Sequence, residues 1–292
     1  MSAAALVLIG VKISIVITVL GLGLSTKPGH ATSLFKDPPQ LVRSLLAMQV
    51  IVPLFAILIV RTFDLDAPVK IALVALSVSP VPPIWPKRTL HAGGEEAYTI
   101  GLLEASAVLS ILIIPIAIAI MQSIFSVPLR TSPISIGTVA FATVIAPLFV
   151  GIEVRHFWPR FAHRTAGAVT NTGFALLIVC ALPLLWKSLP AIASLIGNGT
   201  LLTMIALVLV GLGAGHLLGG PKEGDRTVLG LACAMRHPAI ALALATANFP
   251  NEKLAPAAIV LYLIVSFIVS TPYVMWSKRH ADRSHRPIMA LR

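Results

Sequence analysis

Charged residues are scarce in this chain of 292 residues: Asp, Glu, Lys and Arg make up 11% of it, against 57% hydrophobic residues. Soluble domains carry about 25% charged residues, so the composition excludes a separate soluble catalytic or nucleotide-binding domain. The mean hydropathy of +0.93 indicates a polytopic membrane protein, most of which lies within a lipid bilayer. The net charge of +11 does not indicate a nucleic-acid partner, because the basic residues lie in short loops between apolar segments.

Acidic residues and cysteines are rarer still. No His-Glu-x-x-His, no Gly-x-Ser-x-Gly and no pair of intramembrane aspartates is present, so the sequence predicts that the protein is not an enzyme. The two cysteines, Cys180 and Cys233, lie inside apolar segments and indicate neither a disulfide nor a metal site. We therefore expect no metal and no cofactor. All five aspartates fall in loops or in the tail: Asp37, Asp64, Asp66, Asp225 and Asp282.

Long apolar segments dominate what is present. A transmembrane helix needs about 20 apolar residues, and nine segments approach this length: 3–24, 41–60, 68–86, 95–122, 134–152, 166–186, 198–218, 227–248 and 254–277. The expected fold is an all-α polytopic membrane protein of about nine transmembrane helices in a single domain. Its approximate repeats are 1–122 and 134–277, followed by a basic tail, 278–292.

The basic residues sort between the two sides of the membrane. If the loops alternate, fifteen Lys and Arg residues fall on the side of the C-terminus and five on the other, while Lys12 and Arg236 lie within spans. The excess of positive charge marks the cytoplasmic side. We therefore expect the C-terminus in the cytoplasm and the N-terminus outside, in a bacterial-type inner membrane or a plasma membrane.

Two proline-containing stretches interrupt apolar spans, one in each half of the chain. The first is Ser79-Pro80-Val81-Pro82-Pro83-Ile84-Trp85-Pro86, and the second is Met235-Arg236-His237-Pro238. Proline removes an N–H group and clashes with the preceding turn, and in lipid the freed backbone groups survive only in protein or along a cavity. Two broken spans in corresponding positions indicate the binding site of a secondary transporter.

Two charged residues fall near mid-membrane. Arg236 and Glu104 each lie about ten residues into their spans, roughly 15 Å deep. A charge at that depth costs at least about 2.5–3.5 kcal/mol and should find a partner in the interior. We expect an Arg236–Glu104 pair, either as a structural ion pair or with Arg236 meeting an anionic substrate or Glu104 carrying a proton. His237 either titrates near neutral pH or bonds freed carbonyls.

The basic residues after the first break have two interpretations. They either lie at the cytoplasmic boundary and snorkel or line a basic vestibule. The candidate residues for substrate binding or coupling are Arg236, His237, Glu104, Thr99, Pro80, Pro82, Pro83, Pro86 and Pro238, and those of the vestibule are Lys87, Arg88 and His91.

Three stretches resemble the bile acid:sodium symporter family. Gly21-Leu22-Gly23-Leu24-Ser25-Thr26 is similar to its early Gly-Leu-x-Leu signature. Ser79-Pro80 and then Leu90-His91-Ala92-Gly93-Gly94 resemble its proline-containing crossover and the turn that follows. Met235-Arg236-His237-Pro238-Ala239-Ile240-Ala241 resembles its second crossover, usually Met-Gln-Asn. The resemblance implies two inverted repeats with two discontinuous crossing helices, and transport of a small organic anion.

The sequence departs from this family where the family binds sodium. The resemblance implies sodium sites built on an Asn at the first crossover and on Glu-x-x-Met-Gln-Asn at the second. Here Pro86 stands at the Asn position, and Ala232, Arg236 and His237 replace the Glu, Gln and Asn, while Thr99 matches a position that often holds Ser. Hard cations require oxygen ligands, so these replacements argue against sodium coupling.

Several functions therefore stay open. Arg236 could stand in for a bound cation, which would give a uniporter, an exchanger or a proton-coupled carrier. A non-transporting sensor, scaffold or degenerate paralogue is a different class, and it predicts no substrate-dependent uptake. Proton-coupled antiporters with crossed broken helices usually carry paired acidic residues at the crossing, and this chain has no such pair.

Overall fold

Every described segment of secondary structure is helical. The computed structural model describes residues 3–284 except 27, 28, 31, 83, 107, 110–112, 114–137, 139 and 140, and that part of the chain contains no strand. The helices are α1 (Ala3–Ser25), α2 (Pro38–Leu45), α3 (Val52–Thr62), α4 (Ala67–Ser77), α5 (Trp85–His91), α8 (Ala146–Phe157), α9 (Pro159–Ser194), α10 (Thr200–Leu218), α11 (Glu223–Ala234), α12 (Pro238–Asn248) and α13 (Ala255–Ser284). Residues 96–106 are also helical. Short helical turns are η1 (Leu34–Lys36), η2 (Leu46–Ile51) and η3 (Phe141–Ile145).

Three of the described helices are long and apolar enough to cross a membrane. They are Pro38–Thr62, Thr200–Leu218 and Ala255–Arg283, and shorter apolar helices cover Ile9–Ser25 and Ala67–Ser77. These helices establish an all-helical integral membrane protein, as expected from composition. The spans expected at 95–122 and 134–152 lie partly outside the described residues, so the count of nine stays a prediction.

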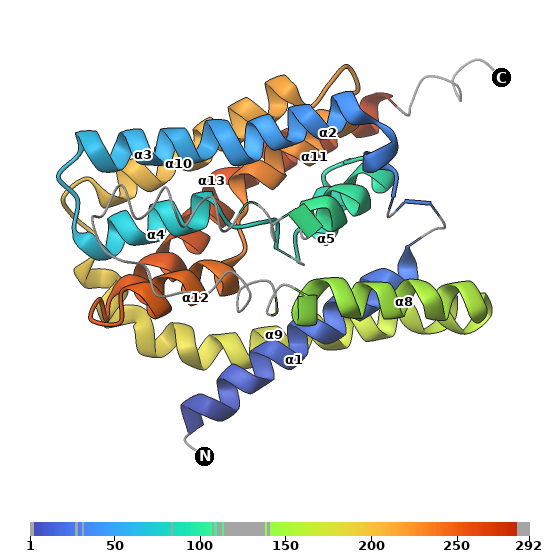
Figure 1. Cartoon of the computed structure of the whole chain (residues 1–292), viewed down its shortest axis with the longest axis horizontal. Coiled ribbons are helices and arrows are strands. Elements are labelled where there is room, and N and C mark those ends of the chain that lie inside the picture. Colours follow the sequence, from blue (N-terminus) through green and yellow to red (C-terminus); the bar gives the residue numbers. More distant parts are fainter. Residues whose placement is uncertain are drawn as a thin grey trace.

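The helices form two groups (Figure 1). Helices α1, α8 and α9 pack mainly on one another and enclose two small apolar clusters of their own, one around Val19 and Leu148 and one around Leu24 and Ala162. The other helices surround the main core, in which α4, α11 and α12 are buried between α2–α3, α10 and α13. The start of α1 and the end of α13 lie at opposite ends of the molecule in this view.

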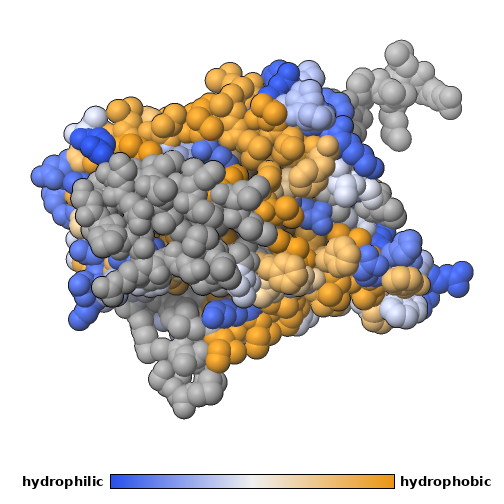
Figure 2. Space-filling view, viewed as in Figure 1, coloured by the Kyte–Doolittle hydropathy of each residue, from blue (hydrophilic) through white to orange (hydrophobic). Residues whose placement is uncertain are grey.

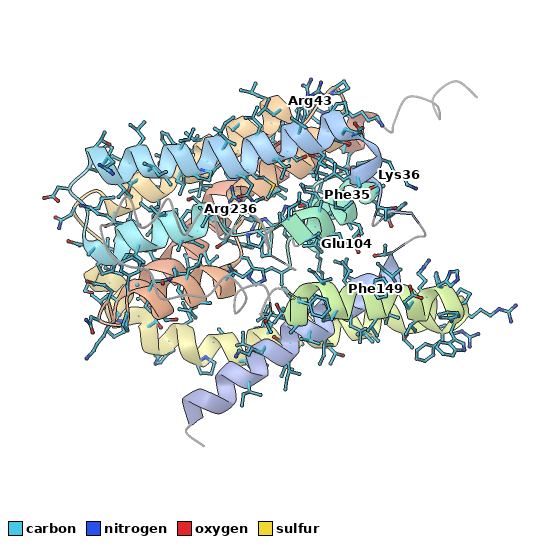
Figure 3. The ribbon with its side chains drawn as sticks, viewed as in Figure 1. Phe35, Lys36, Arg43, Glu104, Phe149 and Arg236 are labelled. Atoms are coloured by element: carbon cyan, nitrogen blue, oxygen red, sulfur yellow. The ribbon has the colours of Figure 1, made fainter. Side chains whose placement is uncertain are left out.

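The polarity of the surface changes along the length of the helices. On the coloured part of the face in Figure 2, hydrophobic side chains cover the middle and hydrophilic ones gather at the two ends of the horizontal helices. This is the pattern of a bilayer belt with polar caps. Lys36 and Arg43 are two of the fifteen basic residues expected on the side of the C-terminus. They are labelled at the same end of the molecule (Figure 3), toward which α13 runs in Figure 1.

The helices extend beyond the spans expected from hydropathy. Helix α9 runs to Ser194 with Pro183 and Pro190 inside it, although 187–197 was expected to be a loop. Helix α13 likewise continues through Lys278 and Arg279 into the expected tail. Hydropathy detects the part of a helix that lies in lipid, but the helical hydrogen bonds continue beyond it. The charged ends of α9 and α13 are therefore predicted as loops from the sequence although they are helical.

The packing of α10 on α11 depends on glycine. A Cβ atom at Gly215 would lie 2.6 Å from the Cα atom of Gly230, which is closer than real side chains approach, whereas one at Gly213 would meet nothing within 4 Å. In a bilayer, helices associate by close packing and not by the hydrophobic effect, and small residues let their backbones approach closely. Gly215 thus fixes the position of α11, which leads into the second break.

Candidate functional site

The two breaks predicted from proline meet inside the core. Helix α4 ends at Ser77 and α5 begins at Trp85, while α11 ends at Ala234 and α12 begins at Pro238. The N–H group of His237 donates a 2.9 Å hydrogen bond to the carbonyl of Pro80, which joins one break to the other. Helix α4 packs beside α12 and α5 beside α11, so each half-helix lies next to the opposite half of the other pair.

The prolines take different positions at these breaks. Pro80 and Pro82 are buried between α4 and α5, and Pro83 lies outside the described residues. Pro86 and Pro238 are not in the breaks but in the first turns of α5 and α12. Proline is tolerated in a first helical turn because its missing N–H has no intrahelical acceptor there. The breaks are therefore shorter than the sequence suggested.

Proline and the breaks leave backbone carbonyls without their helical donors. The carbonyl of Ala234 would pair with the nitrogen of residue 238, which is a proline, and that of Cys233 with the N–H of His237, which turns to Pro80 instead. The carbonyl of Ser79 lies four residues before Pro83. A buried carbonyl without a donor is costly, so each requires another partner.

A third interrupted helix adds one more carbonyl. Residues Leu46–Ile51 form a π-helical turn, and the N–H of Val52 donates to Ala47, five residues back. The matching donor for Met48 would be residue 53, but Pro53 has no N–H. The π-helical turn together with Pro53 therefore frees the carbonyl of Met48 toward the crossing.

Arg236 satisfies three of these carbonyls at once. Its side chain is fully buried, with 0% of its surface exposed. Nε donates to Cys233 at 3.2 Å, Nη1 to Ser79 at 3.1 Å and Nη2 to Met48 at 2.8 Å, all to backbone oxygens. The planar guanidinium presents donors in a fixed fork, which here spans three chain segments. The carbonyls of Met48, Ser79 and Cys233 that hold the guanidinium are called the carbonyl cage below.

Helix α13 supplies donors for the remaining carbonyl. The hydroxyl of Tyr262 donates to the carbonyl of Ala234 at 3.2 Å and that of Ser266 at 2.9 Å, and both side chains are buried. Tyr262 and Ser266 are four residues apart and therefore share one face of the helix. Neither residue was predicted from the sequence, although their spacing of four on the last span places them on one helix face.

Removing both hydroxyls should cost more than the sum of the two single changes. Tyr262→Phe or Ser266→Ala alone leaves one donor on the Ala234 carbonyl, so we expect each to lower the free energy of unfolding by about 1 kcal/mol. The double variant leaves the buried carbonyl without a donor, and we expect an extra coupling of about 1 kcal/mol. Thermal unfolding of the four proteins in detergent measures this. Strict additivity would contradict the shared acceptor.

The expected ion pair between Arg236 and Glu104 is not formed. All three nitrogens of Arg236 donate to carbonyls, and no ion pair joins its guanidinium to the Glu104 carboxylate. The two labels also lie well apart in Figure 3, with Glu104 between α5 and α8. The prediction was wrong because it sought a carboxylate partner and did not count the carbonyls that the prolines free. Glu104 is half-buried.

Two buried side chains at the crossing have ring nitrogens without a partner in the described part of the chain. Among those residues, nothing forms a hydrogen bond with either ring nitrogen of His237, which is 1% exposed, or with Nε1 of Trp85, which is 0% exposed. His237 therefore does not bond the freed carbonyls through its ring. Such unsatisfied groups are rare in native proteins and call for an explanation.

The basic residues after the first break do not converge on one another. Lys87 donates to Oδ1 of Asn171 on α9 at 3.3 Å and lies 4.8 Å from the ring centre of Phe174. Arg88 donates to the carbonyl of Phe267 and the hydroxyl of Thr271 on α13, and stacks 3.9 Å over the Phe267 ring. His91 lies 3.3 Å from Nζ of Lys278. A shared vestibule for the three stays a prediction.

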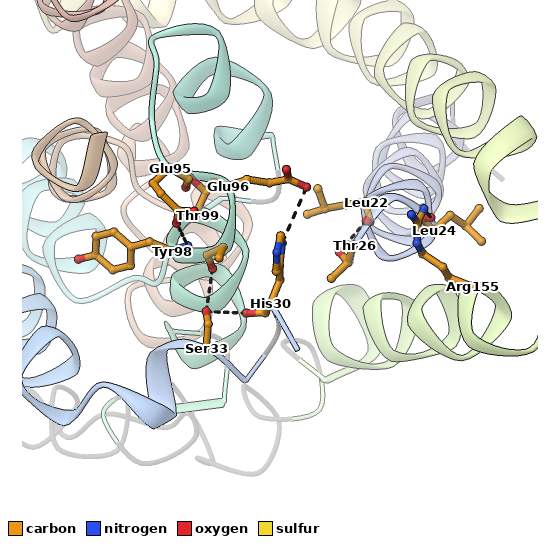
Figure 4. Close-up of polar contacts among 11 residues, drawn as sticks. Leu22, Leu24, Thr26, His30, Ser33, Glu95, Glu96, Tyr98, Thr99 and Arg155 are labelled. Atoms are coloured by element: carbon orange, nitrogen blue, oxygen red, sulfur yellow. Dashed lines mark hydrogen bonds and ion pairs between the residues drawn. The ribbon is translucent and has the colours of Figure 1, made fainter. Parts of the chain in front are cut away.

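Thr99 lies in a network that ties the loop after α1 to helix 96–106 (Figure 4). Its hydroxyl donates at 2.6 Å to the carbonyl of Glu95, the residue before this helix, and the Glu95 carboxylate accepts from the N–H of Tyr98. His30 faces Glu96 at 3.8 Å, and Ser33 donates to the carbonyl of Ala97. Across the view, Arg155 donates to Leu24 at the end of α1.

Comparison with known proteins shows which family and which proteins this chain resembles. The family model described as the Sodium Bile acid symporter family matches residues 12–195. A relative in rice (Oryza sativa subsp. japonica), the probable sodium/metabolite cotransporter BASS2 of the chloroplast, is 22% identical over 89% of this chain. The chain spans 64% of that protein's length. The uncharacterized sodium-dependent transporter YocS of Bacillus subtilis (strain 168) is 23% identical over 83% of this chain and 75% of its own length.

These matches agree with the resemblance seen in the crossover motifs. The family is named for symporters and both relatives are named as transporters or cotransporters, in agreement with the expectation that this chain is not an enzyme. The matched region includes the first break and the part of α1 from Lys12 onward, and the two relatives extend the similarity over most of the chain. The chain belongs to the sodium bile acid symporter family.

Proposed function

We propose that this protein is a secondary transporter that carries a small organic anion across a lipid bilayer by alternating access. The hydrogen bond from His237 to Pro80 is the observation that supports this most, because it brings two broken helices from the two halves of the chain together in the core. Secondary transporters bind their substrates at such discontinuous helices. The proposal includes nine spans in two inverted repeats, with the N-terminus outside.

An anionic substrate fits the electrostatics of the second break. The first N–H groups of a helix have no intrahelical acceptor, and the helix dipole favours an anion there. Helix α12 begins at Pro238, beside the unpartnered ring of His237. Arg236 is fully occupied by the carbonyl cage. We assign anion binding to the start of α12 together with His237 and Trp85, and a coupling role to Arg236.

The two helix groups are the moving parts in this proposal. Helices α1, α8 and α9 pack mainly on one another, whereas the crossing lies in the group around the main core. Rocking of one group against the other would open the crossing to either side in turn. The contact of Lys87 on α5 with Asn171 and Phe174 on α9 spans the two groups and would break during this motion.

Transport can be tested with a variant that removes one unpartnered donor. We expect proteoliposomes to take up members of a mixed pool of labelled organic acids faster than empty liposomes. Trp85→Phe removes the indole N–H, for which the described residues supply no hydrogen-bond partner, so Tm should stay unchanged. The apparent KM should rise about 5–10-fold, the effect of one hydrogen bond of about 1–1.5 kcal/mol.

Trp158→Phe is the matched control, because Trp158 is exposed, and it should leave both values unchanged. Uptake equal to that of empty liposomes across the pool would favour a non-transporting sensor or scaffold. A fall in the Tm of Trp85→Phe without a change in its KM would show that Trp85 is not part of the substrate site.

A further inference from the structure

We propose that the guanidinium of Arg236 is a built-in cation that takes the place of sodium at the crossing, so that this member of the family binds no sodium there. The inference goes beyond the proposed function, because it concerns the ion and not the substrate. It begins from the carbonyl cage, in which a positive group already meets oxygens from three segments of the chain.

Sodium would need oxygen ligands at the crossing, and five backbone oxygens there already accept hydrogen bonds. Arg236 takes the carbonyls of Met48, Ser79 and Cys233. Tyr262 and Ser266 bond the carbonyl of Ala234, and the N–H of His237 bonds that of Pro80. Five backbone oxygens at the two breaks and the π-helical turn thus have donors, so the residues present do not fit a sodium ion.

The charge of the site is also already balanced. Helices α4 and α11 both end at the crossing, and the C-terminal end of a helix carries partial negative charge that favours a cation. Half-helix ends and unwound carbonyls coordinate sodium in other secondary transporters. Arginine keeps its charge in proteins, and Arg236 lies at both helix ends through Ser79 and Cys233. A second cation at this place would repel it.

Two of the replacements seen in the sequence supply no side-chain oxygen. Ala232, in the last turns of α11, is fully buried and has no polar side-chain atom. Pro86, in the first turn of α5, has none either. The described residues contain no group of three or more His, Cys, Asp or Glu side chains that could hold a metal ion. The substitutions in the sequence and the geometry of the cage therefore lead to the same conclusion.

Binding of radiolabelled sodium to the purified full-length protein tests this without requiring a known substrate. We expect no saturable binding and no change in Tm when choline is replaced by sodium, whereas a bound ion would stabilise the folded state by mass action. The sodium-dependent transporter YocS of Bacillus subtilis serves as the comparison protein. Saturable sodium binding by the wild-type protein would overturn the proposal.

A variant without the guanidinium tests whether the carbonyl cage then binds sodium. Arg236→Gln frees carbonyl oxygens of the cage and adds an amide oxygen, so we expect its Tm to rise by several degrees with sodium and not with choline. Arg61→Gln, at an exposed arginine, should not respond to sodium. A folded Arg236→Gln variant that is indifferent to sodium counts against the proposal, and if it does not fold, the wild-type measurement decides. Failure of uptake alone would bear on the transport function and not on this inference.

Discussion

Replacing Arg236 with Met should lower the free energy of unfolding by roughly 3–5 kcal/mol, the cost of leaving buried polar groups without partners. Methionine keeps much of the side-chain volume but donates no hydrogen bond, so the carbonyls of Met48, Ser79 and Cys233 lose their donors together. Each was freed by a proline or by a broken helix, so the backbone cannot replace them. Removing the buried charge offsets part of the loss.

Thermal unfolding in detergent measures the effect, with a fall in Tm of roughly 5–15 °C expected. The Tm of Arg236→Lys should lie between those of the wild type and of Arg236→Met, because the single ammonium group of lysine cannot donate to three chain segments as the planar guanidinium does. Arg61→Met, at an exposed site on α3, is the matched control and should change stability by less than about 0.5 kcal/mol. An Arg236→Met variant as stable as the wild type would show that the cage does not hold the crossing together.

The second large effect is expected at the contact between α10 and α11. Gly215→Ala adds a methyl group 2.6 Å from the Cα atom of Gly230, so the two helices must separate, and we expect a loss of about 1–3 kcal/mol. Because α11 leads into the second break, its displacement should also reduce uptake. Thermal unfolding and uptake are measured on the same preparation.

Gly213→Ala provides a control in the same helix. A methyl group there meets nothing within 4 Å, so stability should stay the same or rise by up to about 1 kcal/mol from the better helix propensity of alanine. If both substitutions lowered the stability equally, α10 would not tolerate alanine at either position. Close packing of Gly215 on Gly230 would then not explain the loss.

The sequence was sufficient to locate the centre of the fold. Proline positions and apolar segments predicted an integral membrane protein with two interrupted spans, and the structure has both breaks near the expected residues. Pro80 and Pro82 each remove a backbone donor within three residues, which disfavours a regular helix more strongly than the well-separated Pro183 and Pro190 of α9 do, and the freed groups cannot face lipid. The motifs around the breaks also indicated the family that the comparisons show.

The partner of Arg236 could not be predicted, because it depends on a helix distant in the sequence. The signal was Pro53, inside a span treated as regular, which leaves Met48 without a donor once the turn becomes π-helical. The register of that turn is decided by tertiary packing and not by local propensity. Lys87 and Arg88 were grouped by sequence proximity, but neighbouring residues of a helix point about 100° apart, and they reach α9 and α13 respectively.

The most direct test of the account compares uptake of one transported organic acid under a sodium gradient, under a proton gradient and under neither. With Arg236 in the carbonyl cage as the fixed cation, the account predicts the same initial rate with a sodium gradient as without one. Uptake that rises only with the proton gradient would agree with this and assign coupling to a titrating group such as Glu104. Uptake that requires inward sodium, with lithium and potassium inactive, would contradict the account.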